Sequence, residues 1–184
     1  MNYLNDAIYT NFFGGDSIAE FSPKVKFVPR FTPPEPGNPY YNRYTEGGYS
    51  GAIYGKPKNP NCTILANCAG YSQARICEAS NRNACDLLEP SNPVDMDKYL
   101  YGKCTVGQVP KLGAIMIWVK DDNPKQGHCA NVEAIMNDTM VVTSESHYGG
   151  VDIDWQIHYT QNGKRFYKEG YTFKEFIYSP YIEA

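Results

Sequence analysis

Several features that would assign this chain of 184 residues to a familiar class are missing from it. No stretch approaches the roughly 20 consecutive apolar residues of a membrane-spanning helix. Met1 to Asp6 form neither the basic nor the apolar segment of a secretory signal peptide. We therefore expect a protein without a membrane span that is made in the cytoplasm. Formal net charge is -3 and no run of Lys or Arg exceeds two residues, so we expect no nucleic-acid partner.

The cysteines also lack the spacing of a structural metal site. No two of them form the C-x2-C or C-x4-C pair that holds zinc. In a reducing cytosol they are expected to be free thiols. No motif calls for a cofactor, and we predict neither a metal nor a cofactor. The six cysteines are Cys62, Cys68, Cys77, Cys85, Cys104 and Cys129.

The first 50 residues differ in composition from the rest. They contain a cluster of prolines, which prevents a continuous helix, and then a cluster of tyrosines. This composition predicts an extended arm over residues 1–50 and one domain over residues 51–184. The aromatic side chains of the arm either dock onto the domain or form a second binding surface.

A helix is predicted to begin immediately after Asn67. Asn is a good N-cap residue, and small or apolar residues then recur at helical spacing as far as Ala79. Cys68 would occupy the first helical position, where unpaired N–H groups and the helix dipole favour negative charge. A second, poorly bounded helix is predicted over parts of residues 81–89 and 94–101, between which Pro90 and Pro93 interrupt the pattern.

After Pro110 the pattern becomes one of strands, which predicts an α+β fold with an antiparallel sheet. The run 114–119 is apolar throughout and fits a central strand. Residues 130–136 and 140–146 flank Asn137-Asp138 as a hairpin, and two further strands cover 151–159 and 171–178.

The hairpin would bring His128 close to Glu145. A two-residue turn at Asn137-Asp138 places Ala130 opposite Glu145, so that His128 and Glu145 become diagonal neighbours on one face, with α-carbons roughly 7–8 Å apart. A three-residue turn would put them on opposite faces. With the two-residue turn, the pattern indicates a cysteine nucleophile, Cys68, with His128 as general base and Glu145 as the group that orients the imidazole.

Each candidate has an alternative. Cys68 could be a buried structural thiol, and Cys62 is a rival nucleophile without a helix start. Glu145 could be an exposed carboxylate at a strand end. His147 could be the third catalytic member instead, or a residue of the cleft.

Aromatic residues and one arginine are candidates for substrate contacts. Arg75 either binds a carboxylate of a substrate peptide or is a solvated or internally paired charge. Trp118 could equally belong to the core. The predicted substrate-binding residues are Tyr71, Trp118, His147 and Tyr148, with Trp155 as a further candidate.

Taken together, five fragments of the sequence resemble the CHAP domain (cysteine, histidine-dependent amidohydrolase/peptidase) of bacteriophage lysins and bacterial cell-wall hydrolases. They occur in the order of that family and cover most of the chain. The arm before them is also similar to the segment that precedes this domain in phage lysins. The fragments are Asn67-Cys68-Ala-Gly-Tyr71-Ser-Gln-Ala-Arg75, Pro110-Lys-Leu-Gly-Ala-Ile-Met-Ile-Trp118, Gly127-His128-Cys-Ala-Asn-Val-Glu133, Thr143-Ser-Glu-Ser-His-Tyr-Gly-Gly150 and Tyr171-Thr-Phe-Lys-Glu-Phe-Ile-Tyr178.

The resemblance implies a papain-like fold, with N-terminal helices packed on an antiparallel sheet, and cleavage of an amide bond in peptidoglycan. It implies a phage endolysin that accumulates in the host cytoplasm and reaches the wall with the help of a holin, or a lysin carried in the virion. Virion proteins or a separate wall-binding domain are then expected partners. Alternatives are a non-catalytic wall-binding or tail structural module on the same fold, and a thiol peptidase or amidase with another substrate.

The chain departs from the family pattern at three places. Cys129 stands where relatives usually carry an aliphatic residue, and Glu145 where they often carry Asn. Some relatives bind calcium just before the nucleophile, but residues 58–66 contain no acidic side chain. We therefore predict no calcium site there.

Overall fold

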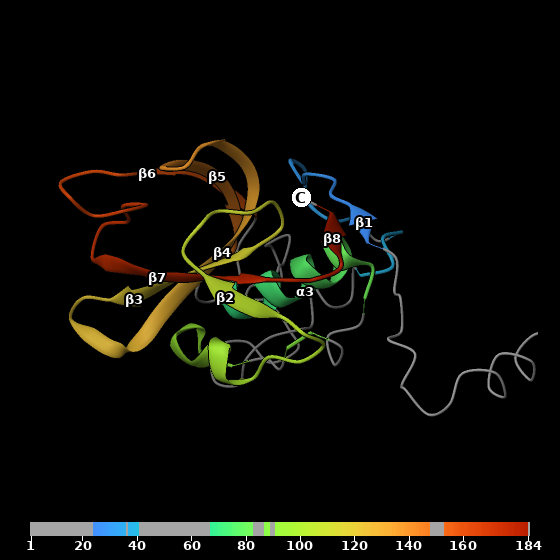
Figure 1. The fold of residues 1–184 in the computed structure, drawn as a ribbon, viewed down its shortest axis with the longest axis horizontal. Coiled ribbons are helices and arrows are strands. Elements are labelled where there is room, and N and C mark those ends of the chain that lie inside the picture. The colour runs from blue at the N-terminus through green and yellow to red at the C-terminus, as the bar shows by residue number, and fades with distance from the viewer. Residues whose placement is uncertain are drawn as a thin grey trace, which may run out of the picture.

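The computed structural model describes residues 24–35, 37–40, 67–82, 87–88, 91–147 and 153–183. Within these ranges the chain forms a mixture of helix and strand in which strands predominate (Figure 1). In chain order the elements are β1 (Val25–Lys26), α3 (Cys68–Ser80), the 3₁₀-helix η2 (Pro93–Lys98), β2 (Thr105–Gly107), β3 (Ile115–Lys120), β4 (Asn123–Asn137), β5 (Met140–Glu145), β6 (Asp154–Tyr159), β7 (Tyr171–Tyr178) and β8 (Ile182–Glu183).

The main sheet has six strands in the order β2-β7-β3-β4-β5-β6, and every neighbouring pair is antiparallel. β3 lies in the interior of this sheet, as its continuous apolar run predicts. A second, two-stranded sheet pairs β1 with β8 in parallel, near the end of α3 (Figure 1). The prediction of an antiparallel sheet with α+β composition is therefore confirmed.

Alternate residues of β3 face two separate cores. Ile115 and Ile117 join a cluster that contains Ile76 and Cys77 of α3. Met116 and Trp118 point to the opposite side, into a cluster rich in phenylalanine. The sheet is buried on both faces over this part, and α3 covers only one of them.

Helix α3 begins and ends where its capping residues place it. The Asn67 side chain accepts a hydrogen bond of 3.0 Å from the Gly70 amide, and Asn81 adopts a left-handed conformation at the C-terminal cap. The predicted start at Cys68 is confirmed. The helix is buried around most of its circumference, since the sheet covers one side and residues 25–40 cross another.

The hairpin of β4 and β5 reaches the predicted pairing by a different route. Asn137 pairs with Met140, so the turn consists of Asp138 and Thr139, and the predicted turn at Asn137-Asp138 is wrong by one residue. Two register shifts follow, one of them at Glu133. Beyond them Asn131 pairs with Ser144. Continued by one residue, this register sets Ala130 opposite Glu145 as predicted.

The predicted arm is described only in part, and its predicted boundary with the domain lies outside the described residues. Where it is described, it docks onto the rest of the chain. Tyr40 packs against two of the buried clusters, and Arg30 donates through its backbone to Glu133 at 2.8 Å. The predicted second helix is represented, in the described part of 81–101, by the short 3₁₀-helix η2.

Candidate active site

Cys68 lies at the first position of α3, half-buried against the cluster between the helix and the sheet. Amide groups in the first turn of a helix have no partner within the helix, and they favour a negative charge placed there. The Cys68 sulfur lies within hydrogen-bonding reach of the Cys129 thiol and of His128. These two groups come from one strand, β4, and meet the helix start together.

His128 and Glu145 form a tight buried pair. The His128 Nε2 atom lies 2.6 Å from Oε2 of Glu145, whose side chain is 0% exposed. This contact leaves Nδ1 as the ring nitrogen that faces Cys68. The structure therefore brings together Cys68, His128 and Glu145, in the order that a thiol, an imidazole and an orienting carboxylate require.

The ionisation states of these groups support one another. The Cys129 thiol and the His128 imidazolium hold the pKa of Cys68 well below its usual range, although burial opposes them. Burial alone would lower the pKa of His128, but Cys68 and Glu145 outweigh it and raise that pKa to about 9. Burial would raise the pKa of Glu145, but His128 and Lys168 lower it to about 2. These shifts all favour the charged forms of the three groups, a thiolate, an imidazolium and a carboxylate.

Cys129 is the neutral member of the sulfur pair. It is fully buried, and burial together with the neighbouring Cys68 thiolate raises its pKa well above the usual range. A thiol that stays protonated can donate its S–H to the adjacent thiolate. The departure from an aliphatic residue at this position therefore places a hydrogen-bond donor beside the candidate nucleophile. None of the four described cysteines forms a disulfide.

A lysine completes the surroundings of Glu145. Lys168 Nζ donates to Oε1 of Glu145 at 3.0 Å, so each carboxylate oxygen has a different nitrogen partner. His147 lies over His128, with ring centroids 5.7 Å apart and nearly parallel planes. Its Nε2 atom is 3.3 Å from Asp154 Oδ2 and 3.9 Å from Glu145 Oε1.

Two of the predicted substrate-binding residues lie in the core instead. Tyr71 is fully buried, and its hydroxyl donates to Ser144 Oγ at 2.7 Å. Trp118 is also fully buried, and its indole N–H donates to the Phe166 carbonyl at 2.9 Å. Neither side chain presents a surface to a ligand, because each polar tip is used within the protein. Large aromatic residues satisfy burial in this way.

The other predicted contacts differ in their accessibility. His147 is 40% exposed and borders the candidate nucleophile's partner, so it remains the predicted residue best placed to touch a substrate. Trp155 is partly buried and donates to the Arg30 carbonyl at 3.0 Å. Tyr148 lies outside the described residues.

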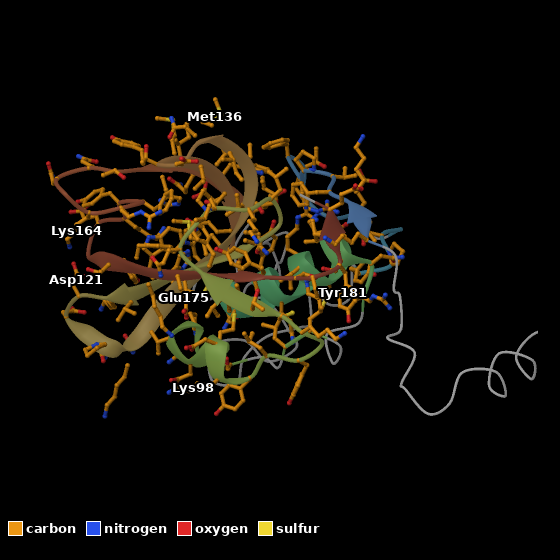
Figure 2. All side chains as sticks on the ribbon, in the orientation of Figure 1. Lys98, Asp121, Met136, Lys164, Glu175 and Tyr181 are labelled. Atoms are coloured by element: carbon orange, nitrogen blue, oxygen red, sulfur yellow. The ribbon has the colours of Figure 1, made fainter. Side chains whose placement is uncertain are left out.

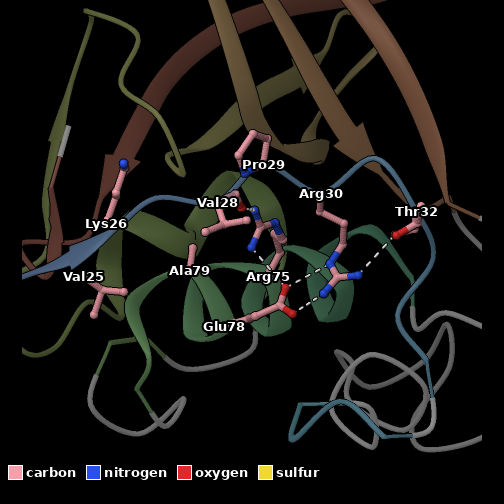
Figure 3. Close-up of a pocket in the computed structure, with 9 residues that line it drawn as sticks. All are labelled: Val25, Lys26, Val28, Pro29, Arg30, Thr32, Arg75, Glu78 and Ala79. Atoms are coloured by element: carbon pink, nitrogen blue, oxygen red, sulfur yellow. Dashed lines mark hydrogen bonds and ion pairs between the residues drawn. The ribbon is translucent and has the colours of Figure 1, made fainter.

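Arg75 forms an internal ion pair, one of the two alternatives considered for it. Its Nε and one terminal nitrogen donate to the two oxygens of Glu133 at 2.8 and 2.9 Å. Figure 3 shows Arg75 beside Glu78 and Arg30 in a cavity of about 390 Å³. The lining of this cavity does not include Cys68, His128 or Glu145, so it is separate from the candidate active site.

Three side chains of the site could in principle share a metal ion. The ligand atoms of His128, Glu145 and His147 lie within 4.8 Å of one another. Both oxygens of Glu145 already accept hydrogen bonds, one from His128 and one from Lys168. A cation here would have to displace the Lys168 ammonium, so the described contacts favour the hydrogen-bonded arrangement.

Sequence reasoning did not identify Lys168, Asp154 or the buried His158. The His158 ring contacts Trp118 in a tilted arrangement, with a centroid distance of 4.6 Å, and burial lowers the pKa of His158 to about 4. Lys168 is separated from Glu145 by 23 residues and belongs to no motif of the sequence. The one available signal was the need of a buried carboxylate for a second partner, which does not specify the residue that supplies it.

No family model matches this chain, and no curated protein is significantly similar to it. In the described part of the chain, none of the helices has the length and apolar composition required to cross a membrane.

Proposed function

We propose that this chain is a cysteine hydrolase of the CHAP type, with a papain-like fold, that cleaves an amide bond of bacterial peptidoglycan. The observation that carries the proposal is the contact of the helix-start Cys68 with His128, whose Nε2 lies 2.6 Å from Glu145. A thiolate, a charged imidazole and an orienting carboxylate in this order are the equipment of acyl transfer. The substrate class rests on the sequence resemblance to lysins.

In the proposed reaction the Cys68 thiolate attacks the carbonyl carbon of the amide, and the carbonyl π-electron pair moves to its oxygen. Collapse of the tetrahedral intermediate breaks the C–N bond, and His128 gives its Nδ1 proton to the departing amine. The acyl group is then a thioester of Cys68. His128, now neutral, takes a proton from water, and the resulting attack releases the carboxylic acid and restores the thiolate.

Three further groups assist this cycle in the proposal. The Cys68 backbone N–H, at the first position of α3, is a donor for the oxygen of the tetrahedral intermediate. Glu145 keeps the imidazole ring in one orientation and stabilises its charged form. His147, half-exposed above His128, is the proposed contact for the substrate on the open side.

The substrate fits a lysin in either of two settings. A phage endolysin would accumulate in the host cytoplasm and reach the wall after a holin opens the membrane. A virion-associated lysin would be carried by the particle. In both cases the partner is peptidoglycan, and a separate wall-binding domain or a virion protein would supply targeting.

The test compares wild type with Cys68→Ala on purified Gram-positive cell walls under reducing conditions. Loss of turbidity measures lysis, and the fragments are analysed for new amino groups and for reducing ends. New amino groups from wild type but not from Cys68→Ala are the expected result. Cys104→Ala is the matched control, since Cys104 is a free, half-buried thiol whose burial raises its pKa to about 11.

Other outcomes reject the proposal in different ways. New reducing ends would indicate a glycosidase. Equal lysis by wild type and Cys68→Ala would show that Cys68 is not the nucleophile. If both proteins bind walls of several types and cleave none, the non-catalytic wall-binding or tail-module alternative is favoured. Turnover of small peptide amides without wall lysis would keep the thiol chemistry and change the substrate.

A further inference from the structure

Glu145 and a thiolate at Cys68 together carry more negative charge than His128 can balance. The Glu145 side chain is 0% exposed, and Cys68, whose thiolate form Cys129 and His128 favour, lies on the other side of His128. Two negative groups then share one imidazolium in a region with little water. A buried carboxylate with one partner either protonates or draws in a second cation.

Lys168 supplies that cation. Its ammonium lies 3.0 Å from Oε1 of Glu145, the oxygen that His128 does not use, and its side chain is only 19% exposed. The ammonium also lies over the Trp118 ring, 5.6 Å from its centre, in a cation–π contact that restricts the position of the ammonium. Thiolate, imidazolium, carboxylate and ammonium together carry no net charge.

The segment before Lys168 is held in a conformation that costs free energy. Phe166 has a φ of 46°, in the left-handed region that a bulky side chain rarely adopts. Its ring is fully buried, and its carbonyl accepts the Trp118 indole N–H at 2.9 Å. Trp118 therefore contacts both the strained residue and the ammonium two residues later.

Further bonds fix the same segment on either side of Lys168. The Tyr167 amide donates to the Tyr159 carbonyl at 2.8 Å, and the Tyr171 amide donates to the Lys168 carbonyl at 3.1 Å. The backbone is thus tied to β6 before the lysine and closed into a turn after it. A lysine on a flexible loop would lose backbone and side-chain conformational entropy on pairing with Glu145. The backbone of Lys168 is already constrained, so its entropy cost is smaller.

We infer that Lys168 is a positioning residue of the proposed reaction, which keeps the Glu145 carboxylate ionised and directs its Oε2 atom toward His128. The inference rests on the proposed function, since it assigns Lys168 to the same Cys68–His128–Glu145 reaction. Lys168 does not touch the reacting sulfur. It acts through Glu145, and its loss therefore has no effect where Glu145 carries no charge.

Several groups besides Lys168 determine the field at Glu145. In the described part of the chain they are Cys68 from α3, His128 and Cys129 from β4, His147 after β5, and Asp154 and His158 from β6. A change in Lys168 alone leaves all of these in place. The comparison of lysine variants therefore isolates the ammonium.

The test uses Lys168→Met, which keeps the length and apolar contact of the side chain, and Lys168→Arg, which keeps the charge. Lys164→Met is the matched control, because Lys164 pairs with Asp121 at the surface (Figure 2), whereas the hydrogen-bond partners of Glu145 are His128 and Lys168. Each variant is made in wild type and in Glu145→Gln. Lysis of walls gives kcat/KM, and mass spectrometry of the Cys68 peptide gives its rate of alkylation by iodoacetamide, both as functions of pH.

In Lys168→Met, Glu145 loses the partner that lowers its pKa, so it binds a proton at higher pH and releases His128. We expect the acid-side midpoint of both profiles to rise by about one pH unit. At pH 7 Glu145 stays ionised, and kcat/KM should fall about tenfold there because Oε2 is no longer directed toward His128. Lys168→Arg should retain most of the wild-type behaviour. In Glu145→Gln, the same lysine change should alter kcat/KM less than about twofold.

The inference is overturned if Lys168→Met lowers kcat/KM equally in both backgrounds, if neither midpoint moves, or if Lys164→Met has the same effect. The two readouts also separate this inference from the proposed function. If the alkylation profile of Cys68 shifts in a way that depends on Glu145, but the protein cleaves no wall, the positioning role of Lys168 is supported and wall hydrolysis is rejected. Wall lysis without a shift in the pH profiles supports wall hydrolysis and rejects the positioning role of Lys168.

Discussion

Helix α3 carries two buried clusters of charge, seven residues apart, and each cluster uses a glutamate from the hairpin of β4 and β5. The first contains Cys68, His128, Glu145 and Lys168. The second contains Arg75, Glu133, Glu78 and Arg30. Ser144 connects them, because it precedes Glu145 in the chain and donates to Glu133 at 2.6 Å.

The clusters differ in what their members can do near neutral pH. Arginine does not lose its proton in a protein, and both oxygens of Glu133 accept from several donors, so the second cluster is a set of hydrogen-bonded ion pairs. The first contains a thiol and an imidazole, whose pKa values are shifted in opposite directions. The same helix–sheet interface thus contains a cluster suited to binding the N-terminal segment and one suited to proton transfer.

Removal of the imidazole should give the largest effect and should be confined to the first cluster. His128→Ala leaves Cys68 without the cation that stabilises its thiolate, so wall lysis should fall by about 10³-fold or more. Alkylation of Cys68 at pH 6 should slow as well. The comparison between the clusters fails if this variant retains activity, or if it loses activity only because it unfolds in a denaturant titration.

Removal of the central guanidinium should affect stability instead. Arg75→Met leaves Glu133 as a buried charge with fewer partners, so the free energy of unfolding should fall by about 3–5 kcal/mol. Alkylation of Cys68 in the remaining folded protein should keep the wild-type pH profile. Urea unfolding measures the first effect, and a shifted profile would show that the two clusters are not separate.

Loss of the Glu145 charge should lower activity by about tenfold to a hundredfold. Cys68 and Glu145 together raise the pKa of His128 to about 9, so the basic limb of the pH–rate profile of wild type should lie near that value. In Glu145→Gln the imidazolium loses its carboxylate and the basic limb should move to lower pH. An unchanged basic limb would mean that Cys68, the other group that raises the pKa of His128, determines it without Glu145.

The smallest effect should follow from Cys129→Val, which removes the S–H donor and keeps a side chain of similar volume. The pKa of Cys68 should rise, because Cys129 is the main group that lowers it. The acid-side midpoint of Cys68 alkylation should therefore increase by about half a pH unit. Cys104→Val is the control. An equal shift of the midpoint in that variant would mean that the shift reflects a general loss of packing and not the loss of the S–H donor.

The local features of the site could be predicted because they depend on neighbours in the chain. Asn67 and the small residues after it determine where α3 begins, and hence that Cys68 meets the helix dipole. The hairpin placed Glu145 on the face of His128, although the turn was expected one residue too early. That error had no consequence at the site, since the register shifts in β4 and β5 restored the pairing.

Contacts between distant segments could not be predicted in this way. Tyr71 and Trp118 are aromatic residues beside the site in sequence, but whether such a ring faces solvent or the core depends on what packs over it. For Arg75 the sequence allowed both a solvated charge and an internal ion pair, because its partner Glu133 lies 58 residues later in the chain. The direction of a side chain follows from its strand or helix, but its partner does not.

By itself, therefore, the sequence determined the start of α3, the central strand, the hairpin and the identity of the thiol, the imidazole and the carboxylate, because helix capping and strand alternation act over a few residues. Only the tertiary structure decided which charges share the buried space. A carboxylate without water must find cations wherever the chain provides them, and for Glu145 the second one comes from Lys168, on a segment held by the strained Phe166.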